Sequence, residues 1–149
     1  MIPGAVGFIV TDKLLGYCAV ETWPAYIICI TIYFMGMVFN RIGSLIIEPW
    51  YHSWKIVEYA KYEDYVVAES KDSKITALSE VNNAYKTYSA EFLTFFIFLI
   101  AMDIYNRINL ISDILRLIFT LGLYVLFSYS YHKQTTYIRK RVAKVIAKK

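Results

Sequence analysis

The sequence is poor in cysteine, glycine, proline and charge. Its two cysteines, Cys18 and Cys29, exclude a disulfide framework and a cysteine-based zinc site. Six glycines and three prolines are too few for a disordered, collagen-like or flexible-linker chain. Charged residues make up 19% of the 149 residues, whereas a soluble domain has about a quarter.

Apolar and aromatic residues take the place of the missing charge. Hydrophobic residues make up 58% of the chain and aromatic residues 17%, and the mean hydropathy is +0.42. Tyrosine and tryptophan, which have one apolar and one polar end, favour membrane interfaces. The composition predicts one small integral membrane domain over residues 1–149.

The sequence carries no signature of a reaction. His52 and His132 lie on different segments without a cysteine or carboxylate at ligand spacing, so no metal site is expected. A glycine-rich phosphate loop, a GxSxG elbow and a Cys–His pattern are all missing. We therefore expect neither an enzyme nor a cofactor.

Three apolar stretches predict transmembrane helices, because about 20 residues cross the hydrocarbon core. Only Asn106 and Arg107 separate the second span from the third, so these two must form a tight antiparallel hairpin. The predicted spans are residues 22–43, 89–105 and 108–131.

Residues 2–20 form a further apolar segment, which Asp12 and Lys13 interrupt. Two interpretations stay open. The segment is either a fourth span with a neutralised Asp12–Lys13 pair inside the bundle, or a helix that lies in the interface. A cleaved signal peptide is not expected, because no positive region precedes the apolar run.

The basic tail predicts the orientation. Residues 132–149 carry seven lysines and arginines and no acidic residue. The positive-inside bias places this tail in the cytoplasm. Residues 48–88 are then cytoplasmic as well, and the Asn106–Arg107 turn is outside.

Residues 48–88 predict a cytoplasmic helical hairpin. Trp50, Trp54, Val57 and Lys61 fall at helical spacing and extend the first span. After a break at residues 71–73, a second stripe leads into the second span through Ile75, Leu78, Asn82, Tyr85 and Ser89. Asn82 and its neighbour Asn83 are either surface amides or contacts to a ligand or to another subunit.

Several motifs resemble a widespread family of small bacterial inner-membrane proteins. They are Asn40-Arg41-x-Gly43-Ser44-Leu45-Ile46-Ile47-Glu48-Pro49 and the LSEVNNAYKT segment of residues 78–87. Proteins of this kind recur as membrane effectors of bacterial anti-phage systems, beside a sensor or a nucleotide-signal enzyme. The resemblance thus implies an effector role in antiviral defence.

Charged and polar groups inside the predicted spans mark candidate pore or helix-seam positions. At the outer hairpin, an Asp103–Arg107 or Asp113–Arg116 pair ties the turn together, or the charges ring the mouth of an oligomeric pore. At the inner side, Arg41 and Glu91 are expected to form an ion pair. The candidates are Gly36, Asn40, Arg41, Ser44, Glu91, Asp103, Asp113 and Arg116.

The tail has two interpretations. Ile138, Val142, Val145 and Ile146 share one side of a helix, which suits a basic amphipathic helix on anionic headgroups. Alternatively, its positive face collects an anionic nucleotide or nucleic-acid ligand. The ligand or partner candidates of the whole chain are Trp50, Trp54, Asn82, Asn83, Arg139, Lys140 and Arg141.

The sequence as a whole predicts an all-α membrane protein that acts as a homo-oligomer, with a tetramer as the expected order, because three or four thin spans cannot enclose a pathway alone. The leading hypothesis is a channel or pore-like effector in the lipid bilayer, gated by a cytoplasmic partner protein or an anionic signal. The first alternative is a non-conducting scaffold that recruits a soluble partner through Trp50, Trp54 and Asn82. The second is a small ion-coupled carrier that uses Glu91 or Asp103.

Overall fold

The computed structural model describes residues 2–15, 23–106 and 110–147, and within them it is helical without any strand. One of the segments, η2, is a π-helix inserted between two α-helices. The elements are α1 (Ile2–Leu15), α2 (Ala25–Ile42), η2 (Gly43–Ile47), α3 (Glu48–Ser53), α4 (Tyr62–Lys71), α5 (Lys74–Asn106) and α6 (Leu110–Ile146).

Three helices are long and apolar enough to cross a membrane, which makes this an all-helical, membrane-embedded protein. They are the continuous α2–η2–α3 rod (Ala25–Ser53), Lys74–Tyr105 of α5 and Ile114–Ile146 of α6. The three predicted spans are confirmed to this extent. With 14 residues, α1 is shorter than the about 20 of a straight crossing, and residues 16–22 lie outside the described part.

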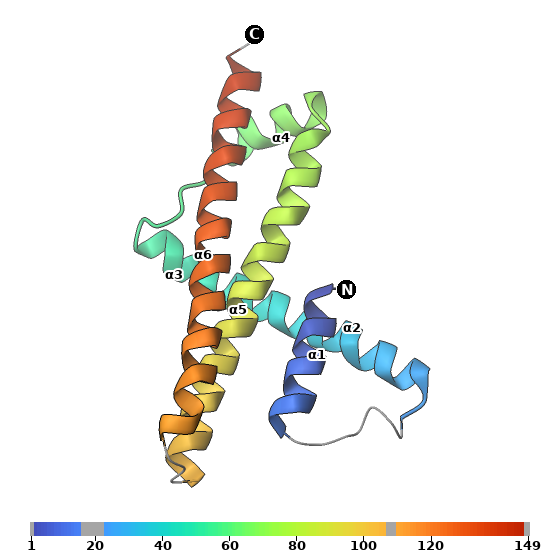
Figure 1. Cartoon of the computed structure of the whole chain (residues 1–149). Helices are drawn as coiled ribbons and strands as arrows, with labels where there is room; N and C mark the ends of the chain where they lie inside the picture. The colour runs from blue at the N-terminus through green and yellow to red at the C-terminus, as the bar shows by residue number, and fades with distance from the viewer. Residues whose placement is uncertain (1, 16–22, 107–109, 148–149) are drawn as a thin grey trace.

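The α5–α6 pair forms the long axis of the molecule (Figure 1). The two helices run antiparallel and pack side by side, as the short connection predicted. The α2–η2–α3 rod passes obliquely across this pair, and α1 packs against α2. α4 and the C-terminus lie at one end of the α5–α6 pair (Figure 1). This end is called the polar end below.

The predicted stripe on α5 faces α6. Ile75 and Ser89, at its two ends, are fully buried. Between them, the Asn82 amide donates a hydrogen bond to Thr135 Oγ1 over 3.0 Å. Farther along, the rings of Phe92 and Phe127 stack with centroids 5.5 Å apart. The prediction that one helix continues from the hairpin into the second span is confirmed.

The first helix of the predicted hairpin ends early. α3 stops at Ser53, and α4 begins only at Tyr62. Lys55 takes a left-handed conformation with φ of 55°. The N–H groups of Lys55 and Ile56 turn back to the carbonyls of His52 and Tyr51, which is the hydrogen-bond pattern of a Schellman helix end. Val57 is still buried, so the apolar spacing reflects a loop that folds back rather than a continuing helix.

The apolar side of the tail packs against other helices of the same chain. Ile138 and Val142 are buried against Ala68 of α4 and Ile75 of α5. Arg141 Nε donates to Asp72 Oδ2 over 2.7 Å, and Arg139 pairs with Glu58. The interpretation of a helix lying on headgroups is therefore wrong: the chain's own α4 covers that stripe, because α6 continues straight to Ile146.

α1 packs on α2 through glycines. A Cβ added to Gly4 would lie 1.9 Å from the Ile32 carbonyl oxygen and 2.8 Å from the Gly36 nitrogen. Both atoms belong to the α2 backbone, so only glycine permits this approach. Such contacts between small residues are typical of helix packing in membranes.

We predict that Gly4→Ala destabilises the protein by about 1–3 kcal/mol, the usual cost of overpacking, because the contacting backbone atoms cannot move aside. Equilibrium unfolding in mixed micelles with rising SDS measures this change. Gly122→Ala is the matched control, since nothing lies within 4 Å of the added Cβ. An equal effect of both variants would contradict the tight α1–α2 contact.

The Asp72–Arg141 contact makes the docking of the tail sensitive to pH. The hydrogen bond from Arg141 and the backbone N–H of Lys74 hold the pKa of the Asp72 carboxyl below its usual range. A lowered pKa in the folded state gives stability that is present above the unfolded-state pKa, about 3.9, and is lost as pH falls through the folded-state pKa.

We therefore expect hydrogen exchange at the C-terminal end of α6 to accelerate as the pH falls below about 4, relative to residues of the α5–α6 seam. Asp72→Asn should show the faster relative exchange already at neutral pH and lose this pH dependence. An unchanged acid response in Asp72→Asn would assign it to other carboxylates.

Candidate functional site

A cavity of about 370 Å³ lies at the polar end, where α3, α4, α5 and α6 meet. Three of the predicted ligand residues, Asn82, Asn83 and Arg139, line it together. Most of their neighbours in the wall are polar or aromatic. The cavity therefore gathers residues that are up to 91 positions apart in the chain, from Glu48 to Arg139.

The more buried of the two ion pairs that involve residues of the wall is that of Lys86 and Glu48. Lys86 Nζ donates to Glu48 Oε2 over 2.8 Å, and the Lys86 side chain is only 9% exposed. Glu48 follows directly after the π-helix η2. A Cβ on Gly43, the first residue of η2, would lie 3.2 Å from both Cγ and the carbonyl oxygen of Lys86. The pair thus fastens the π segment of the first rod to α5.

Two tyrosines close the side of the cavity opposite α5. The hydroxyls of Tyr59, in the loop before α4, and Tyr131, on α6, are 2.5 Å apart. Partial burial and the nearby Glu48 carboxylate raise the pKa of Tyr59 to about 12, against the lowering effect of the bond to Tyr131. Tyr59 therefore stays neutral at physiological pH and offers a hydroxyl, not a charge, to the cavity.

The amides occupy different positions in the wall. Asn82 is tied to Thr135 by hydrogen bonds in both directions. Asn83 is exposed, and its backbone carbonyl accepts a hydrogen bond from Thr87. At the rim, Arg139 pairs with Glu58, which is 63% exposed and hence loosely held. Asn83 and Arg139 are thus the groups freest to turn toward a ligand.

Asn83 also lines a hollow of about 280 Å³ together with Gly36 and Asn40, and two further hollows contain predicted ligand residues. Trp50 and Trp54, with ring centroids 5.0 Å apart, line an apolar groove against Ser128 and His132 of α6. His132 Nδ1 also contacts the carbonyl of Ile56. This groove is suited to an apolar side chain more than to a polar ligand.

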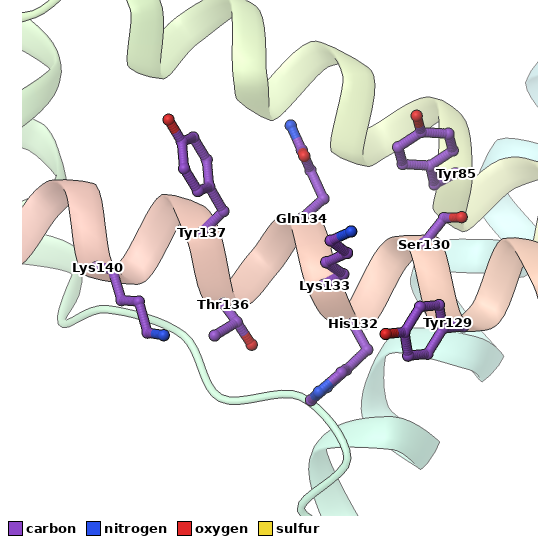
Figure 2. A pocket seen from close by; sticks show the side chains of 9 residues that line it. All are labelled: Tyr85, Tyr129, Ser130, His132, Lys133, Gln134, Thr136, Tyr137 and Lys140. Atoms are coloured by element: carbon purple, nitrogen blue, oxygen red, sulfur yellow. The ribbon is translucent and has the colours of Figure 1, made fainter.

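The last of these hollows is an open groove along α6 that includes Lys140. Figure 2 shows Tyr137 and Gln134 pointing to one side of α6, while Lys140, Thr136 and His132 point to the other. Side chains that diverge in this way do not converge on a ligand. Arg141, the last predicted ligand residue, is held by Asp72.

The predicted pore or seam residues do not meet in one place. Gly36 lies against Gly4, and Asn40 Oδ1 accepts a hydrogen bond from Thr87, so both belong to contacts between helices. Ser44 is half-buried in a shallow groove beside Glu48. Arg41 and Arg116 are exposed on α2 and α6.

The expected Arg41–Glu91 ion pair does not form. Glu91 is fully buried, and neither of its carboxylate oxygens has a hydrogen-bond partner in the described part of the chain. The two residues share a depth along their helices, but Glu91 faces Gly7 and Phe39 whereas Arg41 is exposed.

Near the C-terminal end of α5, the Asp103 Oδ2 atom is buried without a partner among the described residues. Arg107 and the side chains of Asp12, Lys13 and Asp113 lie outside the described part of the structure, and so do the ion pairs expected for them. The described residues contain no group of three or more His, Cys, Asp or Glu side chains that could hold a metal ion.

Sequence reasoning missed the cavity residues Glu48, Tyr59, Lys86 and Tyr131. The periodicity of a single helix places residues on a face but does not pair them with another element. The one available signal was a lysine one helical turn after Asn82 on the stripe that leads into the second span.

No family model, curated protein or solved structure matches this chain.

We predict unequal effects of breaking the Lys86–Glu48 pair from its two ends. Glu48→Gln strands a buried ammonium and should destabilise the protein by about 2–3 kcal/mol, less than the about 3–5 kcal/mol of a fully buried pair because Glu48 is 37% exposed. Lys86→Met leaves a carboxylate that still reaches water, so its cost should be smaller.

The double variant Glu48→Gln/Lys86→Met should recover part of the loss, and unfolding in SDS micelles measures all three proteins. Glu58→Gln, in the exposed pair with Arg139, is the control and should cost less than about 1 kcal/mol. If Glu48→Gln and Glu58→Gln lowered the free energy of unfolding equally, the buried pair would contribute no more to stability than the exposed pair.

Proposed function

We propose that this protein is a channel or pore-like effector of the bacterial inner membrane, which acts as a homo-oligomer and is switched through the cavity at its polar end. The apolar windows of the first and third candidate spans are only 6% buried within one chain. So much uncovered apolar surface leaves room for lipid and for neighbouring copies. The setting in antiviral defence rests on the sequence resemblance and stays a prediction.

The Lys86–Glu48 pair is the observation that carries this proposal. It belongs to the cavity wall, and through Glu48 it also belongs to the rod that contains the π segment Gly43–Ile47. π segments within helices are less favourable than regular turns and occur often at functional sites. A contact that joins a cavity to such a segment can convert ligand binding into a change of the rod.

An anionic ligand suits this switch. A phosphate or carboxylate in the cavity would compete with Glu48 for Lys86 and attract Arg139 at the rim. Release of Glu48 would then free the C-terminal end of the π segment. The ligand class includes a nucleotide, a short nucleic acid and an acidic segment of a partner protein.

A scaffold is the second candidate, and the apolar groove of Trp50 and Trp54 favours it. Trp54 is 65% exposed beside its ring contact with Trp50. Exposed aromatic pairs are common anchors for partner proteins. A scaffold needs no conduction, so an ion-flux measurement separates it from a channel.

We predict that purified full-length protein in liposomes conducts ions, and that Glu48→Gln raises the basal flux severalfold because it releases the π segment without a ligand. Inorganic triphosphate or a short single-stranded RNA should raise wild-type flux and have little further effect on Glu48→Gln. The control is Glu63→Gln, an exposed acid in the first turn of α4, which should behave as the wild type.

The oligomeric mass in detergent is measured for each variant. A stable oligomer without flux in the wild type, with both probes and in Glu48→Gln would overturn the channel and leave the scaffold. An Arg116→Ala variant that alters conductance while the oligomeric mass is kept would place Arg116 in or beside the pathway.

A further inference from the structure

The most unusual group in the described structure is the carboxyl of Glu91. Its relative exposure is 0%, and both of its oxygens lack a hydrogen-bond partner among the described residues. It lies next to a cluster of buried aromatic rings formed by Phe39, Phe92 and Phe95. An acidic residue placed in this way within a transmembrane helix is expensive and is commonly functional.

α1 covers this carboxyl at Gly7. A Cβ added to Gly7 would lie 2.9 Å from Glu91 Oε1 and 2.8 Å from the Phe39 ring. The helix therefore needs a residue without a side chain where it passes over the carboxyl. Residues 3–9 of α1 read PGAVGFI, so this stretch brings no titratable or hydrogen-bonding side chain to Glu91.

The other helices around Glu91 offer no neutralising partner within the described structure. Tyr88, one turn earlier on α5, is the titratable side chain close enough to interact with it, and a phenol brings no positive charge. The remaining titratable groups nearby are engaged or exposed: Lys86 pairs with Glu48, Tyr124 of α6 hydrogen-bonds Tyr51, and Arg41 of α2 is exposed.

We propose that Glu91 is a proton-binding site, and that its bound proton is what allows α1 to lie on α2 and α5. An ionised carboxylate without water, a cation or a donor is far more costly to bury than the neutral acid. When Glu91 gives its proton to water, the carboxylate must be hydrated. α1 then has to move away, because its Gly7 covers the carboxyl. The ligand of the site is thus a proton, and α1 is the element whose position reports it.

The test measures the distance between α1 and α5 in liposomes as a function of pH. Spin labels are attached to cysteines at Ile9 and Ile97, which are 59% and 58% exposed, in a Cys18→Ser/Cys29→Ser background. The pH series runs from about 4 to about 10, which includes both ordinary and strongly perturbed carboxyl groups. The populations with α1 docked and released are read from the distance distribution.

The docked form should dominate at acid pH, and its ratio to the released form should fall by up to about tenfold per pH unit, the slope for one coupled proton. Glu91→Gln and Glu91→Met cannot ionise, so α1 should stay docked across the series in whichever of them folds. Glu80→Gln, which removes an exposed acid from the same helix, should keep the wild-type response.

A wild-type distance distribution that does not change with pH would overturn the proposal. The same holds if Glu91→Gln or Glu91→Met releases α1 with the wild-type pH dependence. Because no ion flux is measured, this result is independent of whether the protein is a channel.

Discussion

The constraint on which the structure depends is the continuity of α5 and α6. Each helix runs without a break from its apolar part to the polar end, over 33 and 37 residues. Polar groups on these extensions lie inside the narrow seam between the two helices, so they must find partners within the chain. The hydrogen bonds between Asn82 and Thr135 meet this need, and the stacked rings of Phe92 and Phe127 continue the same seam as an apolar contact.

The other elements pack on the α5–α6 pair by covering its remaining apolar surface and by bonding its remaining polar groups. α4 covers the apolar side of the tail at Ile138 and Val142, and Tyr51 of α3 hydrogen-bonds Ser128 of α6 over 2.5 Å. η2 approaches α5 closely at Gly43, where an added Cβ would lie 3.2 Å from Lys86. The cavity exists because the loop of residues 54–61 and the short α4 bridge the two long helices instead of filling the space between them.

Much of this fold follows from the sequence, because the periodicity of apolar residues shows which side of a long helix is buried. The stripe from Ile75 to Ser89 is an example, and so are the three spans. The residues around Lys55 are different: a buried Val57 at helical spacing cannot reveal that a lysine takes a left-handed conformation. Similarly, the apolar residues of the tail were correctly predicted to share one side of a helix. Periodicity does not say whether lipid or α4 covers that side.

The site was less predictable than the fold, because its contacts join elements far apart in the sequence. Asn82, Asn83 and Arg139 were found by residue type, and the structure places them in one wall. Glu48 and Lys86 are 38 positions apart, and nothing in their local pattern pairs them. The expected Arg41–Glu91 pair was wrong for a different reason. Two residues can lie at a similar depth along neighbouring helices while their side chains point in different directions.

The cavity and the buried carboxyl lie beside the same rod, α2–η2–α3. Lys86 and Glu91 are five residues apart on α5, so they lie about 7.5 Å apart along its axis and point in different directions. Lys86 lies against Gly43 of η2, and Gly7 of α1 lies against both Glu91 and Phe39 of α2, one turn earlier on the same rod. Coupling between two sites requires an element with two arrangements that both sites bias. If both proposals hold, we expect the α2–η2 junction to be that element, because Gly43 lies against Lys86 while Phe39 and Glu91 lie against the same residue of α1.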